Sequence, residues 1–145
     1  MITAIIEQDH DAGREFLADV GNATQPAWDG REQGIRGFAA LWQRHGAILA
    51  QVVAPRLTGH GSVLDPLLDQ QRLVAERAGD LVRRASGHDA DGRWLVDFEA
   101  LKALFDAQCL REETELLPLI RDHVPPADVA DMTRQARALG QPPLR

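Results

Sequence analysis

The chain contains no tyrosine and only one cysteine and one lysine, and these scarcities already limit what it can be. A single cysteine, Cys109, excludes an internal disulfide and is typical of a reducing compartment, so we expect a cytoplasmic protein. No apolar run approaches the roughly 20 residues that a membrane-spanning helix needs. The N-terminal Met-Ile-Thr-Ala-Ile-Ile-Glu has no basic region, so we expect neither a secretory signal nor a membrane partner.

Acidic residues outnumber basic ones, 22 to 16, and strand-forming patterns are scarce. The formal net charge of −6 argues against a nucleic-acid partner, because phosphate contacts need a basic face. No segment alternates apolar and polar residues with period two, so the sequence predicts no strand. It also has no Gly-rich phosphate loop and no nucleophile elbow, and we therefore predict that it is not an enzyme.

Helical periodicity is present along most of the chain. Loops are indicated at 22–30, with Pro26 and Asp29-Gly30, and where Pro125-Pro126 stop the last long helix. Short connections place successive helices antiparallel. We therefore predict one domain over 1–145, an all-α, antiparallel up-down-up-down four-helix bundle with a core over 2–124 and a short C-terminal fifth helix. The predicted helices are 2–20, about 32–57, 65–85 with Asp65 at the N-cap and Pro66 at N1, about 95–124 and about 127–139.

Polar residues interrupt the apolar face of every long helix. In the fourth helix the face repeats at intervals of 4, 3, 4, 4 and 3 through Leu101, Phe105, Gln108, Glu112, Leu116 and Leu119. The corresponding residues on the other helices are His10, His45 and Gln71. Unpaired buried polar groups are costly, so these five side chains should meet in one polar layer across the bundle.

A faint internal repeat supports the pairing of these helices. His45 precedes Pro55 by ten residues, and Gln108 precedes Pro118 by ten. The second helix pair therefore resembles the first in layout.

Inward-pointing imidazoles and carboxylates on facing helices are how bundles build metal sites. Three stretches carry a family resemblance: Asp9-His10, His45 with Pro55, and Gln108-x3-Glu112-Glu113 with Leu117-Pro118. On these residues the chain resembles, over about 2–124, the hemerythrin-like family of HHE cation-binding domains. The resemblance implies a bundle in which histidines and carboxylates hold two irons, and which binds or senses O2 or stores metal.

This sequence departs from the family's ligand pattern. Leu49 stands where the family has a glutamate in helix 2, and Gln71 and Gln108 stand where it has histidines in helices 3 and 4. The matching ligand positions that remain are His10, His45 and Glu112. The resemblance implies that these three belong to one iron, so we do not expect a di-iron centre.

Two hypotheses follow for the polar layer. In the first, His10, His45 and Glu112 hold a single Fe or other divalent cation, since two histidines and one carboxylate are the ligand set of many mononuclear Fe(II) sites. Such a site would bind or sense the metal or a small ligand. In the second, no metal binds, and the amides of Gln71 and Gln108 satisfy the layer by hydrogen bonds. The bundle is then a regulatory or interaction module, with a homodimer or a regulatory protein as partner; an Fe(II) enzyme ranks last.

The neighbours of these residues carry less information. Glu113 and Glu115 are predicted to lie on a solvated face. Asp9 is predicted to be surface charge, with the alternative that it orients an imidazole. Cys109 is predicted to be an inert, half-buried thiol.

Overall fold

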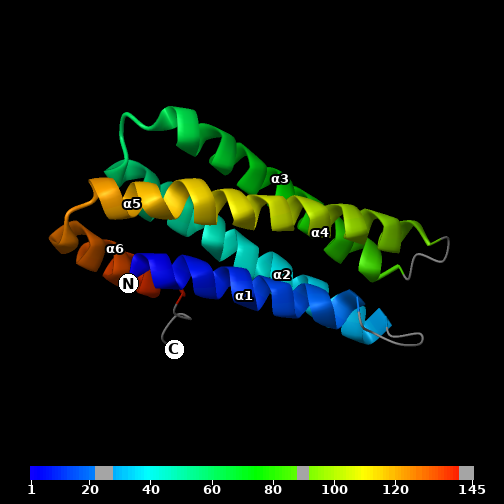
Figure 1. Cartoon of the computed structure of the whole chain (residues 1–145). Helices are drawn as coiled ribbons and strands as arrows, with labels where there is room; N and C mark the ends of the chain where they lie inside the picture. The colour runs from blue at the N-terminus through cyan, green and yellow to red at the C-terminus, as the bar shows by residue number, and fades with distance from the viewer. Residues whose placement is uncertain (22–27, 88–91, 141–145) are drawn as a thin grey trace.

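The structure, a computed structural model, describes residues 1–21, 28–87 and 92–140. Within these ranges the chain forms helices and turns but no strand, which confirms the all-α prediction. Four long helical rods contact one another in sequence order and run antiparallel, and the last helix packs where the first begins (Figure 1). The rods are α1 (Ile2–Gly21); α2 (Trp28–Ala47) continued by η1 (Ile48–Val53) and η2 (Ala54–Arg56); α3 (Gly61–Ala85); and α4 (Arg93–Arg111) continued by η3 (Glu112–Leu116) and α5 (Leu117–His123), followed by the separate helix α6 (Pro126–Gly140).

Two helix starts differ from the prediction. α2 begins at Trp28 rather than near residue 32, with Asp29 in its first turn, where an acid is favourable. α3 begins at Gly61 rather than at Asp65, because the His60 carbonyl already accepts two backbone N–H groups. Pro66 therefore lies inside α3 instead of at its first position.

Two π-helical turns interrupt the second and fourth rods, and each lies just before a proline, Pro55 or Pro118. A proline in a regular helix removes one hydrogen bond and its ring clashes with the carbonyl four residues earlier. A π turn changes the backbone hydrogen-bond pattern locally, from residues four apart to residues five apart. Such turns are frequent at functional sites. The fourth rod consequently runs through Pro118 to His123, and the second ends at Arg56. The closing bonds run from the N–H of Ala54 to the carbonyl of Leu49 and from the N–H of Leu117 to the carbonyl of Glu112.

The π turn also changes which residues of the fourth rod face the core. An extra residue per turn shifts the buried stripe, so that Ile120 is buried and the predicted Leu119 is only partly buried. On α3 the buried positions on either side of Gln71 are Leu67 and Val74, whereas Leu68 and Ala75 are partly exposed.

The buried apolar residues form two separate clusters. Their side chains differ, because every fully buried phenylalanine and tryptophan of the described chain lies in one of them. The aliphatic core consists of Ile2, Ile6, Ile48, Leu49, Val52, Val53, Leu57, Leu64, Leu67, Leu116, Leu117, Ile120, Val124, Met132 and Ala136. The aromatic core consists of Phe38, Trp42, Trp94, Phe98 and Phe105 with Leu17, Val20, Ile35, Val74, Ala78, Leu81, Ala85, Leu101 and Cys109.

On every rod, the predicted polar layer falls between these two clusters. On α1, for example, His10 lies between Ile6 of the aliphatic core and Leu17 of the aromatic core. None of the helices in the described ranges combines the length and apolar character needed to cross a membrane.

Candidate metal centre

The predicted layer residues are all buried, and three of them converge. His10, His45 and Glu112 each have 0% of their surface exposed. The Nε2 atoms of both imidazoles contact the same carboxylate oxygen, Glu112 Oε1, at 3.0 Å for His10 and 2.7 Å for His45. One ligand atom from each residue lies within 4.8 Å of the others, so the group could hold a metal ion.

Each member comes from a different rod and is held there by its neighbours. His10 lies in the middle of α1, His45 near the end of α2, and Glu112 at the first residue of the π turn η3. The ring of Trp42, one turn before His45, stacks on that imidazole with ring centres 4.5 Å apart and an interplanar angle of 19°. The aromatic core therefore supports one side of the group.

A carboxylate also lies on the far nitrogen of each imidazole. The Nδ1–H of His45 donates to Asp9 Oδ2 and the Nδ1–H of His10 donates to Glu113 Oε1, both at 3.0 Å. Such outer carboxylates fix the tautomer and the orientation of a ligating histidine. The prediction that Asp9 is surface charge is wrong, because Asp9 is buried and bonded to the His45 ring. This bond is the contact that the alternative, an imidazole oriented by Asp9, requires. The prediction for Glu113 is wrong in part, because its side chain is 35% exposed and yet bonded to a buried ring.

Arginines hold these outer carboxylates from the surface. Arg44 forms an ion pair with Asp9, and Arg14 lies 3.4 Å from Glu113 Oε1. Asp9 and Arg44 also line a surface hollow of about 340 Å³ between α1, α2 and α6. The chain of contacts thus runs from solvent through Arg44, Asp9 and His45 to Glu112.

The pattern around each ring has a chemical consequence. A neutral imidazole carries only one N–H, yet each ring meets a carboxylate oxygen at both nitrogens. Both contacts are favourable if the ring is protonated, or if a cation lies between Nε2 and Glu112 Oε1.

The charges of the group shift the pKa values of its members. Burial lowers the pKa of His45, but the charge of Glu112 and the hydrogen bonds that His45 donates to Asp9 and Glu112 outweigh burial and raise the pKa to about 9. Burial raises the pKa of Glu112, and the charge of His45 with the hydrogen bonds from both imidazoles outweighs it, lowering the pKa to about 2. Glu112 is therefore an anion at neutral pH, and it favours a positive charge beside it.

The two glutamines have different roles. Gln108 belongs to the group, since its Nε2 donates to Glu112 Oε2 at 2.8 Å and to the Leu67 carbonyl at 3.0 Å. Gln71 is buried too, but its Nε2 donates to the Trp42 carbonyl at 2.8 Å rather than to an imidazole or to Glu112. The indole N–H of Trp42 donates in return to the Gln71 carbonyl, so this pair joins α2 to α3.

Leu49, which occupies a ligand position of the resembled family, is buried in the aliphatic core. Within the described ranges, no other group of three or more His, Cys, Asp or Glu residues lies close enough to share an ion. Cys109 is 1% exposed and so fully buried rather than half-buried, and burial together with the Glu112 charge raises the pKa of its thiol. No protein-family model, curated protein or solved structure gives a significant match to this chain.

Proposed function

We propose that this chain is a hemerythrin-like domain that binds one divalent cation through His10 Nε2, His45 Nε2 and Glu112 Oε1. The observation that supports the proposal is the approach of both Nε2 atoms to one oxygen, at 3.0 and 2.7 Å, in a fully buried group. The carboxylates on both Nδ1 atoms add to it, because they direct the lone pairs of Nε2 inward.

The donor set favours a transition metal. Two imidazoles and one carboxylate suit Fe(II), and also Zn(II), and leave coordination positions open for a small ligand. Gln108 fits this arrangement: its Nε2 is bonded to Glu112, and its buried Oε1 has no hydrogen-bond partner among the described residues. An amide oxygen in that position is able to accept a hydrogen bond from water on the ion. The role that we propose for this site is binding or sensing of the metal or of a small ligand.

The proposal is limited to one ion. A second ion would need ligands from α3 and from η1, where Gln71 and Leu49 stand. The amide of Gln71 is bonded to a backbone carbonyl, and Leu49 has no donor atom.

A metal-free module is the second candidate, and one observation favours it. The hydrogen bonds that Glu112 makes with Gln108, His10 and His45 satisfy its carboxylate without an ion. The bundle would then serve as a regulatory or protein-interaction module whose polar layer fixes the register of the rods.

Elemental analysis of protein produced with added iron tests the first candidate. We expect about one equivalent of metal per chain, and we expect His10→Ala and Glu112→Gln to remove it, since three protein ligands hold the ion. Glu115→Gln is the matched control, because Glu115 lies on the same turn but is exposed and paired with Arg111. Wild-type protein without metal, even after incubation with excess Fe(II) or Zn(II), would contradict the proposal.

Glu112→Leu separates the two candidates by a second measurement. If the wild type holds metal, this variant loses it and unfolds at lower temperature than the loaded protein. If the wild type is metal-free and Glu112→Leu is equally or more stable, the metal-free module is favoured, because apolar packing can outweigh a buried polar cluster.

A further inference from the structure

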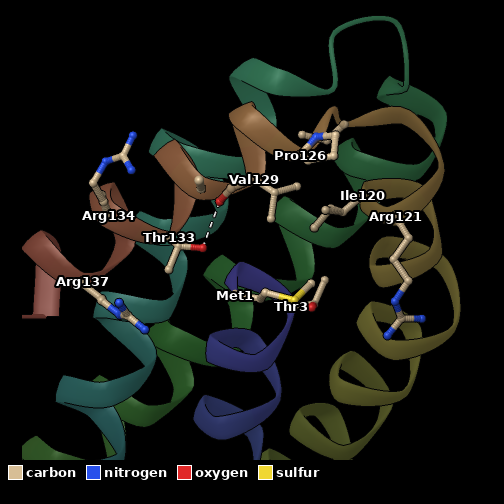
Figure 2. A pocket seen from close by; sticks show the side chains of 11 residues that line it. Met1, Thr3, Ile120, Arg121, Pro126, Val129, Thr133, Arg134 and Arg137 are labelled. Carbon is tan, nitrogen blue, oxygen red and sulfur yellow. Dashed lines mark hydrogen bonds between the residues drawn. The ribbon is translucent and has the colours of Figure 1, made fainter.

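A cavity of about 610 Å³ lies at the end of the bundle where α6 packs. One of its lining residues, Arg137, also lines the hollow of about 340 Å³ beside Asp9 and Arg44. Figure 2 shows the cavity between the start of α1, the end of α5 and one side of α6. It shares no lining residue with the group of His10, His45 and Glu112. Its lining consists of Met1, Thr3, Ile120, Arg121, Val124, Pro126, Val129, Ala130, Thr133, Arg134 and Arg137.

The walls of the cavity are aliphatic. Ile120 from α5 and Val129 from α6 both line it (Figure 2), and none of the described residues in the lining is aromatic. The Thr133 hydroxyl is already used, because it donates to the Val129 carbonyl at 2.9 Å. The volume is in the range of small-molecule sites, and such walls favour an aliphatic chain over a flat ring.

The charge of the lining is of one sign. Among the described residues that line the cavity, three are arginines and none is acidic, although the chain as a whole has a net charge of −6. Arg121 lies 3.8 Å from Glu7, and Arg134 is paired with Asp131 on its own helix. Arg137 has no ion-pair partner among the residues that the structure describes, and its guanidinium remains available for an anion.

We propose that this cavity binds an aliphatic amphiphile with a single carboxylate, of which a medium-chain fatty acid is the simplest example. The chain would lie against Ile120 and Val129, and the carboxylate would pair with Arg137. A guanidinium is suited to this, since its planar fork matches a carboxylate with two parallel hydrogen bonds. Figure 2 shows Arg121 and Arg137 on opposite sides of Met1, so a second guanidinium lies on the other side of the same cavity.

Calorimetric titration of the full chain with decanoate, kept below its micelle concentration, tests the proposal. We expect saturable binding of about one decanoate per chain. Decanol, which has the same chain and no charge, should bind at least about tenfold more weakly, since a hydrogen bond to a charged group is lost. Equal affinity for the acid and the alcohol, or no saturable binding of decanoate, would overturn the proposal.

Two variants examine the two parts of the site. Arg137→Gln should weaken decanoate at least about tenfold and leave decanol unchanged, whereas Arg72→Gln, an exposed arginine paired with Asp69 on α3, should change neither. Ala130→Trp places a large side chain in the cavity from an exposed position and should abolish binding. Circular dichroism and thermal unfolding confirm that each variant is folded. Wild-type affinity for decanoate in folded Arg137→Gln or Ala130→Trp would also contradict the proposal.

Discussion

The aromatic core and the aliphatic core are built in different ways, although the same four rods pass through both. In the aromatic core, large rings contact one another directly. Phe105 meets both Phe38 and Trp42 edge to face, with ring centres 5.2 Å apart in each pair. The aliphatic core contains no ring, and it holds both π turns and receives α6. The candidate metal centre lies where the two meet, with Trp42 stacked on His45.

This difference suggests a division of labour along the bundle. A core of interlocked rings has a fixed geometry, which suits the support of a site whose ligands must be placed precisely. Aliphatic side chains and π turns tolerate irregularity, and the irregular features are found there: the shifted stripe of the fourth rod and the cavity beside α6. The predictions that follow test this contrast, beginning with the largest effect.

The strongest test compares truncations in the two cores. Phe105→Ala should lower the free energy of unfolding by about 3–5 kcal/mol, because it removes a ring that contacts two others. Ile6→Val in the aliphatic core should cost only about 0.5–1.5 kcal/mol. Urea unfolding measures both losses of unfolding free energy. A loss for Phe105→Ala no larger than that for Ile6→Val would contradict the proposed difference between the aromatic and the aliphatic core.

The buried group of His10, His45 and Glu112, which lies between the two cores, should make the stability of the metal-free protein depend on pH. The pKa of His45 is raised from 6.5 to about 9. Its contribution to the free energy of unfolding is therefore complete below pH 6.5 and is lost as the pH rises through 9. The pKa of Glu112 is lowered from 4.5 to about 2, so its contribution is present above pH 4.5 and is lost as the pH falls toward 2.

Each loss should be on the order of 3 kcal/mol in the free energy of unfolding, measured by urea titration across this pH range. His45→Gln should remove the alkaline fall, because an amide does not titrate. An alkaline fall of the same size in His45→Gln would show that another group causes it.

Glycine positions sharpen the comparison, since alanine is normally the better helix residue. A Cβ on Gly13 would lie 2.7 Å from Phe105, and we expect Gly13→Ala to destabilise the protein by about 1–3 kcal/mol through overpacking. On Gly79 the nearest atom is 3.5 Å away, at the end of the Arg83 side chain, so Gly79→Ala should stabilise by about 0.5–1 kcal/mol. Thermal unfolding distinguishes the two variants. A change in stability of the same sign in both would contradict close packing around Phe105.

The smallest effect concerns Cys109, which lies in the aromatic core at the edge of the polar group. Its burial and raised pKa should make the native thiol unreactive toward Ellman's reagent at pH 8, while one thiol reacts in denaturant. Rapid reaction of the native protein would indicate that this half of the bundle opens easily.

The helical period was sufficient to predict much of this arrangement. It predicted the all-α class and the burial of His10, His45, Gln71, Gln108 and Glu112, because a stripe that repeats every three to four residues must face one side. It did not predict the π turns, and the buried stripe beyond Glu112 was therefore placed at Leu119 instead of Ile120.

The outer contacts of the site were harder to predict. Asp9 and Glu113 are adjacent in sequence to His10 and Glu112, where the period places them beside the stripe rather than on it. Their bonds to the two imidazoles depend on how the rods are rotated against each other, and a single sequence does not specify that rotation. The resemblance in ligand positions was a useful guide to the inner group and gave no information on this outer shell.

The most direct test is calorimetric titration of the metal-free protein with Zn(II) at pH 7, in two buffers of different ionisation enthalpy. We predict about one ion per chain with release of at least about one proton, because His45, whose pKa is raised to about 9, must free its Nε2 to bind. Glu112→Gln should remove the binding. Heats of dilution alone in the wild type, or binding without proton release that survives Glu112→Gln, would contradict a cation held between His10, His45 and Glu112.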